Sequence, residues 1–239
     1  MFEQELNIAT HDGEMPVFVA HPDGDGSWPT VVMLMDGGGI REGLRQNART
    51  LAARGYIVVL PNLFHRGASS GPIFDLTDMA RITELNSSLK PEDVVGDVEA
   101  CIRHAAPVSR GGVGLIGYCM GARLSITVSQ ALGDRIAAVV ALHPGYLSTN
   151  RPTSPDRHLD NIKARLYVAT PEHDEHLSKN AFERFKQALD AQPIAYEAEI
   201  IWGAHHGFGV PGRPSYHQGG SDHCWSKAFA LFSEQLAPT

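Results

Sequence analysis

The sequence predicts an α/β fold in which a mostly parallel central sheet carries helices on both faces. Two observations lead to this expectation. Apolar runs such as 30–35 and 56–60 are continuous rather than alternating, which is typical of parallel strands buried on both sides. These runs alternate along the chain with segments of helical periodicity, as in repeated β-α units. The length of 239 residues fits a single domain spanning residues 1–239.

The strands and helices are expected in a regular order. An antiparallel hairpin opens the chain, because two alternating runs, 5–10 and 15–20, flank an Asp-Gly turn. Buried strands are then expected at 30–35, 56–60, 112–117, 135–142, 163–170 and 195–202. Helices are expected at 41–54, 91–106, 120–132, 178–189 and 222–236.

Local signals mark the ends of several helices. Gly55 follows the first helix as a C-cap, Pro91 takes the favoured first position of the second, and Ser178 is an N-cap. Between residues 62 and 90 the periodicity breaks up, and we expect a long excursion with a short helix near 76–85. Long segments of this kind inside a compact domain usually form a functional lid or wall.

Composition and charge exclude several classes of protein. A net charge of −7 argues against nucleic acid or an anionic membrane as a partner. The chain has no run of 18 apolar residues, and its first five residues lack the basic region and apolar core of a signal peptide. Its three cysteines, Cys101, Cys119 and Cys224, are widely spaced and odd in number, which suits reduced thiols. We therefore expect a cytoplasmic protein.

The short stretch 117–121, Gly-Tyr-Cys-Met-Gly, predicts a nucleophile. An apolar strand precedes it and a helical pattern follows it, which is the sequence form of a nucleophile elbow with Cys119 in place of serine. Such a turn is strained, and strand and helix approach too closely for side chains at Gly117 and Gly121. A buried structural cysteine in a glycine-rich turn is the alternative, since free cysteine is among the most buried residue types.

Two further residues complete a candidate catalytic triad. Asp174 follows the expected strand 163–170 by four residues, and His206 follows the strand 195–202 by four. The order of nucleophile, acid and base is that of the α/β-hydrolases. Strand ends converge at one edge of a parallel sheet. There, the histidine would take the thiol proton of Cys119 and the acid would hold the imidazole.

The same edge offers an oxyanion hole. One donor is expected to be the backbone N–H of Met120, the residue after the nucleophile. The other is expected to be the N–H of Gly37, in the glycine-rich turn that follows the strand 30–35. The alternative is that residues 37–39 form a flexible loop.

Taken together, these motifs resemble the dienelactone hydrolase family. The shared features are the elbow at 117–121, the segments 60–64 and 95–100, the acid at Asp174 and the histidine loop at 204–208. The resemblance implies the α/β-hydrolase fold and a carboxylic-ester or lactone hydrolase with a Cys-His-Asp triad. It implies a small-molecule substrate, with no metal and no cofactor. The family pattern places the base two residues before Phe208, which selects His206 over His205.

The resemblance also implies roles for residues around the nucleophile. An acid after the strand 30–35 is expected to lie against the thiol and control its protonation; this chain has Asp36 where the family usually has glutamate. Arg81 stands where one carboxylate-binding arginine is expected. The second such position holds Val210, and Arg213 lies three residues further on. Surface charge is the alternative for both arginines.

Tyr118, beside the nucleophile, is expected either to line the substrate pocket or to serve in packing.

Residues 112–117 also match the dinucleotide-binding pattern G-x-G-x-x-G, but their context argues against a nucleotide site. The glycines fall inside the expected strand, and residues 109–111 before them lack strand character. The acid expected at the end of the next strand is also missing, because Asp134 precedes that strand.

Two other functions stay open. Twelve histidines invite a metal site built from His173, Asp174, His176, His205 and His206, although no His-Glu-x-x-His helix is present. A non-catalytic binding module on the same fold is the second alternative.

Overall fold

The computed structural model describes residues 1–67 and 78–237. The strands are β1 (Phe2–Thr10), β2 (Gly13–His21), β3 (Trp28–Leu34), β4 (Ile57–Pro61), β5 (Ser109–Tyr118), β6 (Ala138–Leu142), β7 (Arg165–His173) and β8 (Tyr196–His205). The helices are α1 (Glu42–Ala52), α2 (Met79–Ser88), α3 (Pro91–Ala105), α4 (Met120–Leu132), α5 (Lys179–Asp190) and α6 (Gln218–Gln235).

The strands form one eight-stranded sheet in the order β1-β2-β4-β3-β5-β6-β7-β8. The first two strands make an antiparallel hairpin, and β2 also runs antiparallel to β4. All later neighbours are parallel. The expected fold class, a mostly parallel sheet with an N-terminal antiparallel hairpin, is confirmed.

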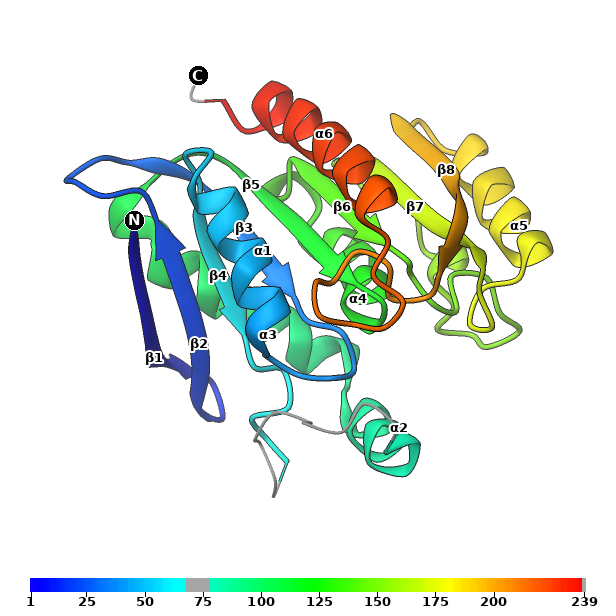
Figure 1. Ribbon diagram of the computed structural model, residues 1–239, viewed down its shortest axis with the longest axis horizontal. Helices are drawn as coiled ribbons and strands as arrows, with labels where there is room; N and C mark the ends of the chain where they lie inside the picture. The colour runs from blue at the N-terminus through cyan, green and yellow to red at the C-terminus, as the bar shows by residue number, and fades with distance from the viewer. Residues whose placement is uncertain (68–77, 238–239) are drawn as a thin grey trace.

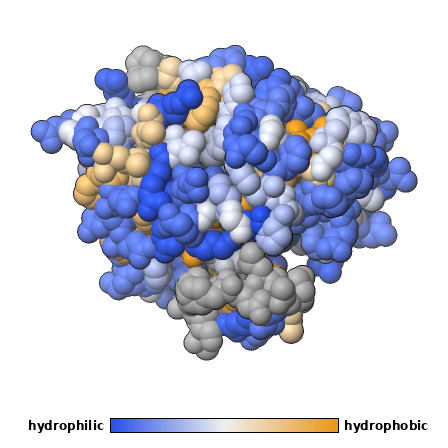
Figure 2. Space-filling model, in the orientation of Figure 1, coloured by the Kyte–Doolittle hydropathy of each residue, from blue (hydrophilic) through white to orange (hydrophobic). Residues whose placement is uncertain are grey.

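Helices cover both faces of this sheet. In Figure 1, α1 and α6 lie in front of the strands, while α3 and α4 lie behind them. The front pair packs on opposite halves of the sheet, α1 on β2 and β4 and α6 on β6, β7 and β8. With both faces covered, β4 and β6 are buried along their whole length. The face shown in Figure 2 is mostly hydrophilic, as expected when the large apolar side chains are inside.

Several element boundaries differ from the expected ones. β5 begins at Ser109, so residues 109–111 are strand after all, because Trp28 of β3 pairs with Ser109. β6 begins only at Ala138, since Gly133–Arg135 form a 3-10 turn. α6 begins four residues earlier than expected, where the ring of His217 accepts the N–H of Gly220 and caps the helix.

Other differences bear on the candidate site. β7 and β8 extend three residues beyond the expected ends, so that His173 pairs with His205. In consequence, Asp174 and His206 follow their strands immediately rather than after four residues. The expected short helix of the excursion is α2, and the preceding residues 68–77 lie outside the described part of the chain. In that described part, we find no helix that combines the length and the apolar character needed to cross a bilayer.

Backbone contacts explain why glycine flanks the turn between β5 and α4. A Cβ atom at Gly121 would lie 2.2 Å from the carbonyl oxygen of Leu34, and one at Gly117 would lie 2.2 Å from the carbonyl oxygen of Gly121. Backbone atoms of β3, β5 and α4 therefore pack directly against one another. No side chain fits at either position without moving a strand or the helix.

Replacing Gly121 with alanine is expected to disrupt this packing. We expect Gly121→Ala to lower the free energy of unfolding by about 3 kcal/mol or more, because the new methyl group meets backbone rather than a flexible side chain. Gly96→Ala in α3 is the matched control. Its Cβ would come no closer than 3.9 Å to the ring of His11, so it should stabilise the protein by about 0.5–1 kcal/mol. Denaturant titration measures both; equal stability of Gly121→Ala and wild type would contradict the packing argument.

Candidate active site

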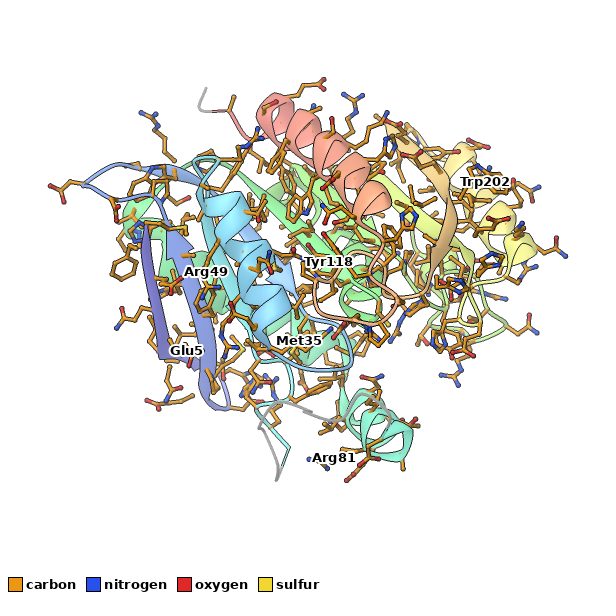
Figure 3. All side chains as sticks on the ribbon, in the orientation of Figure 1. Glu5, Met35, Arg49, Arg81, Tyr118 and Trp202 are labelled. Carbon is orange, nitrogen blue, oxygen red and sulfur yellow. The ribbon has the colours of Figure 1, made fainter. Side chains whose placement is uncertain are left out.

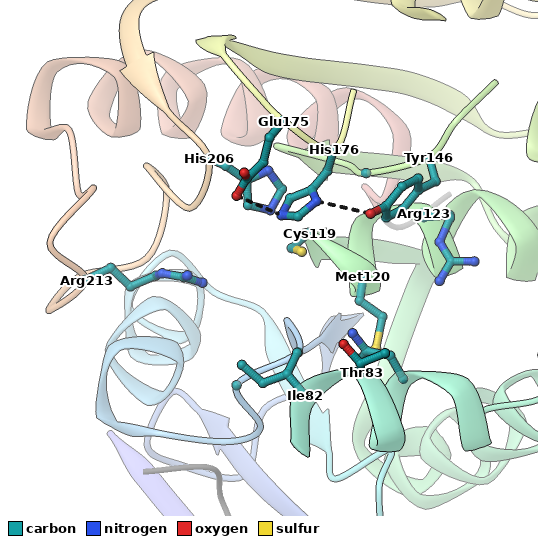
Figure 4. A pocket seen from close by; sticks show the side chains of 14 residues that line it. Ile82, Thr83, Cys119, Met120, Arg123, Tyr146, Glu175, His176, His206 and Arg213 are labelled. Atoms are coloured by element: carbon teal, nitrogen blue, oxygen red, sulfur yellow. Dashed lines mark hydrogen bonds and ion pairs between the residues drawn. The ribbon is translucent and has the colours of Figure 1, made fainter. Parts of the chain in front are cut away.

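A pocket of about 250 Å³ opens at the carboxyl ends of the parallel strands. Its lining comes from the turn after β3, from α2, from the turn between β5 and α4, and from the loops that follow β6, β7 and β8. Figure 4 shows Cys119 in the middle of this lining, with His206 beside it. This is the edge of the sheet where a parallel α/β fold gathers its chemistry.

The backbone holds Cys119 in a strained conformation. Its φ of 54° and ψ of −111° are rarely adopted by a residue with a side chain, and they turn the chain from β5 into α4. The N–H of Cys119 donates to the carbonyl of Leu142 at 3.0 Å, and its carbonyl accepts the N–H of Arg123 at 3.2 Å. These bonds tie the turn to β6 on one side and to the first turn of α4 on the other. The half-buried thiol therefore stands at a helix N-terminus and lines the pocket.

His206 and Asp174 form a buried pair beside the thiol. Nδ1 of His206 lies 2.9 Å from Oδ2 of Asp174, and the side chains are 12% and 1% exposed. The other carboxylate oxygen accepts the N–H of His176 at 2.8 Å, so both oxygens have partners. This arrangement leaves the Nε2 atom of His206 for the thiol.

Charge favours protonation of His206. Burial opposes the charged form, but the hydrogen bond to Asp174, the neighbouring thiol of Cys119 and the negative charges of both groups raise the pKa of His206 to about 10. Two other imidazoles pack edge-on against its ring, His143 at 5.1 Å and His176 at 4.5 Å between centroids. Burial lowers the pKa of both neighbours, so of the three imidazoles His206 is the one whose surroundings favour the positively charged form.

Gly37 and Met120, the expected oxyanion donors, both line the pocket. In the tight turn after β3, the N–H of Gly38 donates to the carboxylate of Asp36 at 2.9 Å and the N–H of Gly39 to its carbonyl at 3.1 Å. The N–H of Gly37 makes no such bond within the described residues. Met120 is the first residue of α4, where backbone N–H groups lack a partner inside the helix.

Asp36 lies in a buried cluster with two arginines. Arg41 donates hydrogen bonds to both oxygens of the fully buried carboxylate at 2.5 and 2.6 Å, and Arg213 donates one to Oδ2 at 2.9 Å. Burial acts to raise the pKa of Asp36, but the hydrogen bonds and charges of Arg41, with the charge of Arg213, hold it below its usual value. The hydrogen-bond partners of the Asp36 carboxylate are therefore Arg41, Arg213 and the N–H of Gly38. Control of the thiol's protonation would instead require contact between this carboxylate and Cys119.

The three expected substrate-binding residues have different positions. Arg213 lines the pocket, although its guanidinium is paired with Asp36. Arg81 lies on α2 at the periphery of the molecule, where it pairs with Glu84 at 2.9 Å, and it is not part of the pocket lining (Figure 3). Tyr118 is fully buried, with its ring 5.9 Å from that of His143. Of its two expected roles, the structure therefore shows packing.

Sequence reasoning missed several residues of the pocket wall, above all Arg123, Tyr146 and His176. The position of Arg123 in the pocket wall could have been predicted from the sequence, because Arg123 lies one helical turn after Cys119. Tyr146 had none, since its positive φ of 57° and its hydrogen bond to Nδ1 of His176 depend on how the loops after β6 and β7 meet.

The structure divides the expected metal ligands into two groups. The rings of His173 and His205 face each other at 4.8 Å between centroids, while His206 pairs with Asp174 and packs against the ring of His176. Within residues 1–67 and 78–237, the group whose ligand atoms come close enough to hold an ion is His11, Asp12 and Asp93, and none of these three residues lines the pocket. The glycines of the dinucleotide pattern lie inside β5, as expected for a strand rather than a phosphate-binding turn.

An eight-stranded sheet with helices on both faces, and a cysteine on a strained strand-to-helix turn beside a His-Asp pair, define an α/β-hydrolase. The chain belongs to the dienelactone hydrolase family, whose model matches residues 15–236. It is 27% identical over 238 residues to a protein of Salmonella typhi assigned as a carboxymethylenebutenolidase, covering 95% of this chain and 86% of that one. It is 31% identical over 134 residues to the carboxymethylenebutenolidase of Pseudomonas putida, covering 54% and 56% of the two chains.

Solved structures show the same fold. A structure assigned as a dienelactone hydrolase of Klebsiella pneumoniae superposes with a TM-score of 0.89 at 24% identity, covering 98% of both chains. A dienelactone hydrolase-like promiscuous phosphotriesterase from metagenomic libraries superposes with a TM-score of 0.82 at 17% identity, covering 99% of both chains.

The buried cluster around Asp36 makes a testable contribution to stability. Asp36→Asn removes the carboxylate and leaves Arg41 and Arg213 without their partner. We expect it to lower the free energy of unfolding by about 3–5 kcal/mol, as when one member of a buried ion pair is removed. Asp23→Asn, at a side chain that is 78% exposed, should change it by less than about 0.5 kcal/mol. Unchanged stability of Asp36→Asn, together with altered reactivity of Cys119, would instead support control of the thiol by Asp36.

The interaction with Asp174 predicts the titration of His206. We expect NMR titration of the imidazole to show the pKa of about 10 in the wild type and a markedly lower pKa in Asp174→Asn. Because this pKa lies above the value of 6.5 that is usual for histidine, its contribution to stability is fully present below about pH 6.5 and is lost as the pH rises through about 10. His143 is the internal control, since its pKa should stay low in both proteins. An unchanged His206 titration in Asp174→Asn would contradict this electrostatic account.

Proposed function

We propose that the protein hydrolyses a small carboxylic ester or lactone, with Cys119 as nucleophile, His206 as base and Asp174 as the acid that orients the imidazole. The observation that carries the proposal is the placement of a strained cysteine and a buried His-Asp pair on one pocket. The names of the relatives, carboxymethylenebutenolidase and dienelactone hydrolase, support an ester or lactone as the substrate.

In the first half of the reaction, the proton of the Cys119 thiol passes to Nε2 of His206, whose raised pKa favours the thiolate–imidazolium pair, and the thiolate attacks the substrate carbonyl. The N–H groups of Gly37 and Met120 donate to the oxygen that becomes negatively charged. The carbon–oxygen bond of the ester then breaks, the leaving alkoxide takes the proton from His206, and the acyl group stays on Cys119 as a thioester.

Water completes the cycle. His206 removes a proton from a water molecule as its oxygen attacks the thioester carbonyl. The same two N–H groups hold the second oxyanion. When the carbon–sulfur bond breaks, the thiolate recovers a proton from His206 and the carboxylic acid leaves. Asp174 stabilises the imidazolium in both halves, consistent with its effect on the pKa of His206.

Asp36 fits this scheme as a positioning residue. Its carboxylate holds Arg213, which lines the pocket, and its backbone continues directly into Gly37. Through Asp36, the turn that carries one oxyanion donor is linked to the loop that carries His206. Control of the thiol by Asp36, the role implied by the family pattern, would require the carboxylate to leave its two arginines.

Removing the nucleophile tests the proposal. We expect Cys119→Ala to reduce kcat/KM for p-nitrophenyl acetate by at least about 10³-fold, because no other group forms the thioester. Its circular dichroism and Tm should match the wild type. Mass spectrometry of the wild type quenched during turnover should show the acetyl group on Cys119. Retained hydrolysis in Cys119→Ala would refute the assignment.

Cys101→Ala, at a buried free thiol of α3, is the matched control and should keep its activity. If wild-type Cys119 resists thiol reagents and no ester is turned over, the protein is a binding module. Activity that is lost with EDTA and returns with zinc would favour the metal hydrolase instead.

A further inference from the structure

The pocket contains an arginine with an unusual lack of partners. Within residues 1–67 and 78–237, the arginines that are at least partly buried pair with a carboxylate, with the exception of Arg123. The paired ones are Arg41, Arg45, Arg49, Arg66, Arg81 and Arg213. The guanidinium of Arg123 makes no ion pair and no hydrogen bond with the described residues, and it lines the pocket.

The surroundings of Arg123 make this isolation costly. Burial lowers the pKa of Arg123, and the charge of Arg151 lowers it further, while Cys119 and Tyr146 act in the opposite direction. Among the residues that the structure describes, no carboxylate contributes to this shift. A partly buried guanidinium without an anionic partner loses hydration and gains no ion pair in return. Such a group in a cleft indicates a binding site for an anion.

The two arginines expected to bind substrate each have a carboxylate partner. Arg213 is held by Asp36, and Arg81, outside the lining, pairs with Glu84. Figure 4 shows Arg123 and Arg213 on opposite sides of Cys119. Among the described residues, an anionic substrate therefore meets an arginine without a carboxylate partner on the side of Arg123, and on the other side an arginine that shares Asp36 with Arg41.

We propose that Arg123 binds a carboxylate of the substrate and thereby selects esters or lactones that carry one acid group. This inference rests on the proposed hydrolysis at Cys119. Arg123 lies in α4 four residues after Cys119, so its backbone stands about one helical turn, roughly 6 Å along the axis, beyond the nucleophile. A spacer of about three methylenes between the acid group and the reacting carbonyl has a similar length. One guanidinium matches one carboxylate through two parallel hydrogen bonds.

The neighbouring Tyr146 gives this side of the pocket a defined shape. Its N–H donates to the carbonyl of His176 at 2.9 Å, and its hydroxyl lies 3.2 Å from Nδ1 of the same histidine. The ring is held at the pocket while 56% of the residue stays exposed. An apolar spacer between acid group and carbonyl can pack on this ring.

A matched pair of esters tests the role of Arg123. p-Nitrophenyl hemiglutarate carries a carboxylate three methylenes from its ester carbonyl, and p-nitrophenyl 5-methylhexanoate has an uncharged isopropyl group in the same place. We expect the ratio of their kcat/KM values, anionic over neutral, to fall about 10- to 100-fold in Arg123→Gln, as when a charge-assisted hydrogen bond is lost. Arg123→Lys should restore part of the ratio. Arg135→Gln, at a surface arginine paired with Glu99, should leave it unchanged.

A binding measurement separates this inference from the proposed hydrolysis. In the Cys119→Ala background, NMR titration with monomethyl glutarate and dimethyl glutarate measures affinity without turnover. Weaker binding of the monoanion in Cys119→Ala/Arg123→Gln, with little change for the diester, supports the inference even if no ester is hydrolysed. The inference is overturned if Arg123→Gln changes neither the rate ratio nor the monoanion affinity, or if Arg81→Gln or Arg213→Gln causes the loss in its place.

Discussion

The close approach of three backbone segments at Gly117 and Gly121 is the constraint on which the rest of the site depends. Because α4 starts directly against the end of β3, the cysteine between the glycines is forced out of the sheet and toward the pocket. The same approach puts the first N–H groups of α4 next to the turn after β3. Cys119 and the two proposed oxyanion donors are thus positioned by one packing contact, and the His-Asp pair needs only to reach that point from two later strands.

Most of the fold was predictable from the sequence, because buried parallel strands have a strong signal. The continuous apolar runs marked β3 and β4 at nearly their observed positions. The ends of β7 and β8 were not predictable. Their last residues, such as His173 and His205, are polar and belong to the sheet only because they pair with each other at its edge.

The candidate site, too, was predictable from the sequence only in part. Cys119, Asp174 and His206 were readable because each follows a strand, and the ends of neighbouring parallel strands meet in space. The partners of Asp36 were not readable, since Arg213 is 177 positions away and its approach depends on the path of a loop. Arg123 shows a different limit. A sequence reveals that an arginine is present, whereas the absence of a carboxylate beside it is a property of the folded chain.

The cluster of Asp36 with Arg41 and Arg213 has a consequence for how this fold accepts change. The loop after β8 supplies both His206 and Arg213, and it is tied to the start of α1 through one buried acid. A graft of this loop from a relative would leave Asp36 without one of its two cations unless the donor loop brought an arginine of the same reach. Changes to the turn after β3 and changes to the loop after β8 therefore depend on each other, and the two segments must be exchanged as a pair.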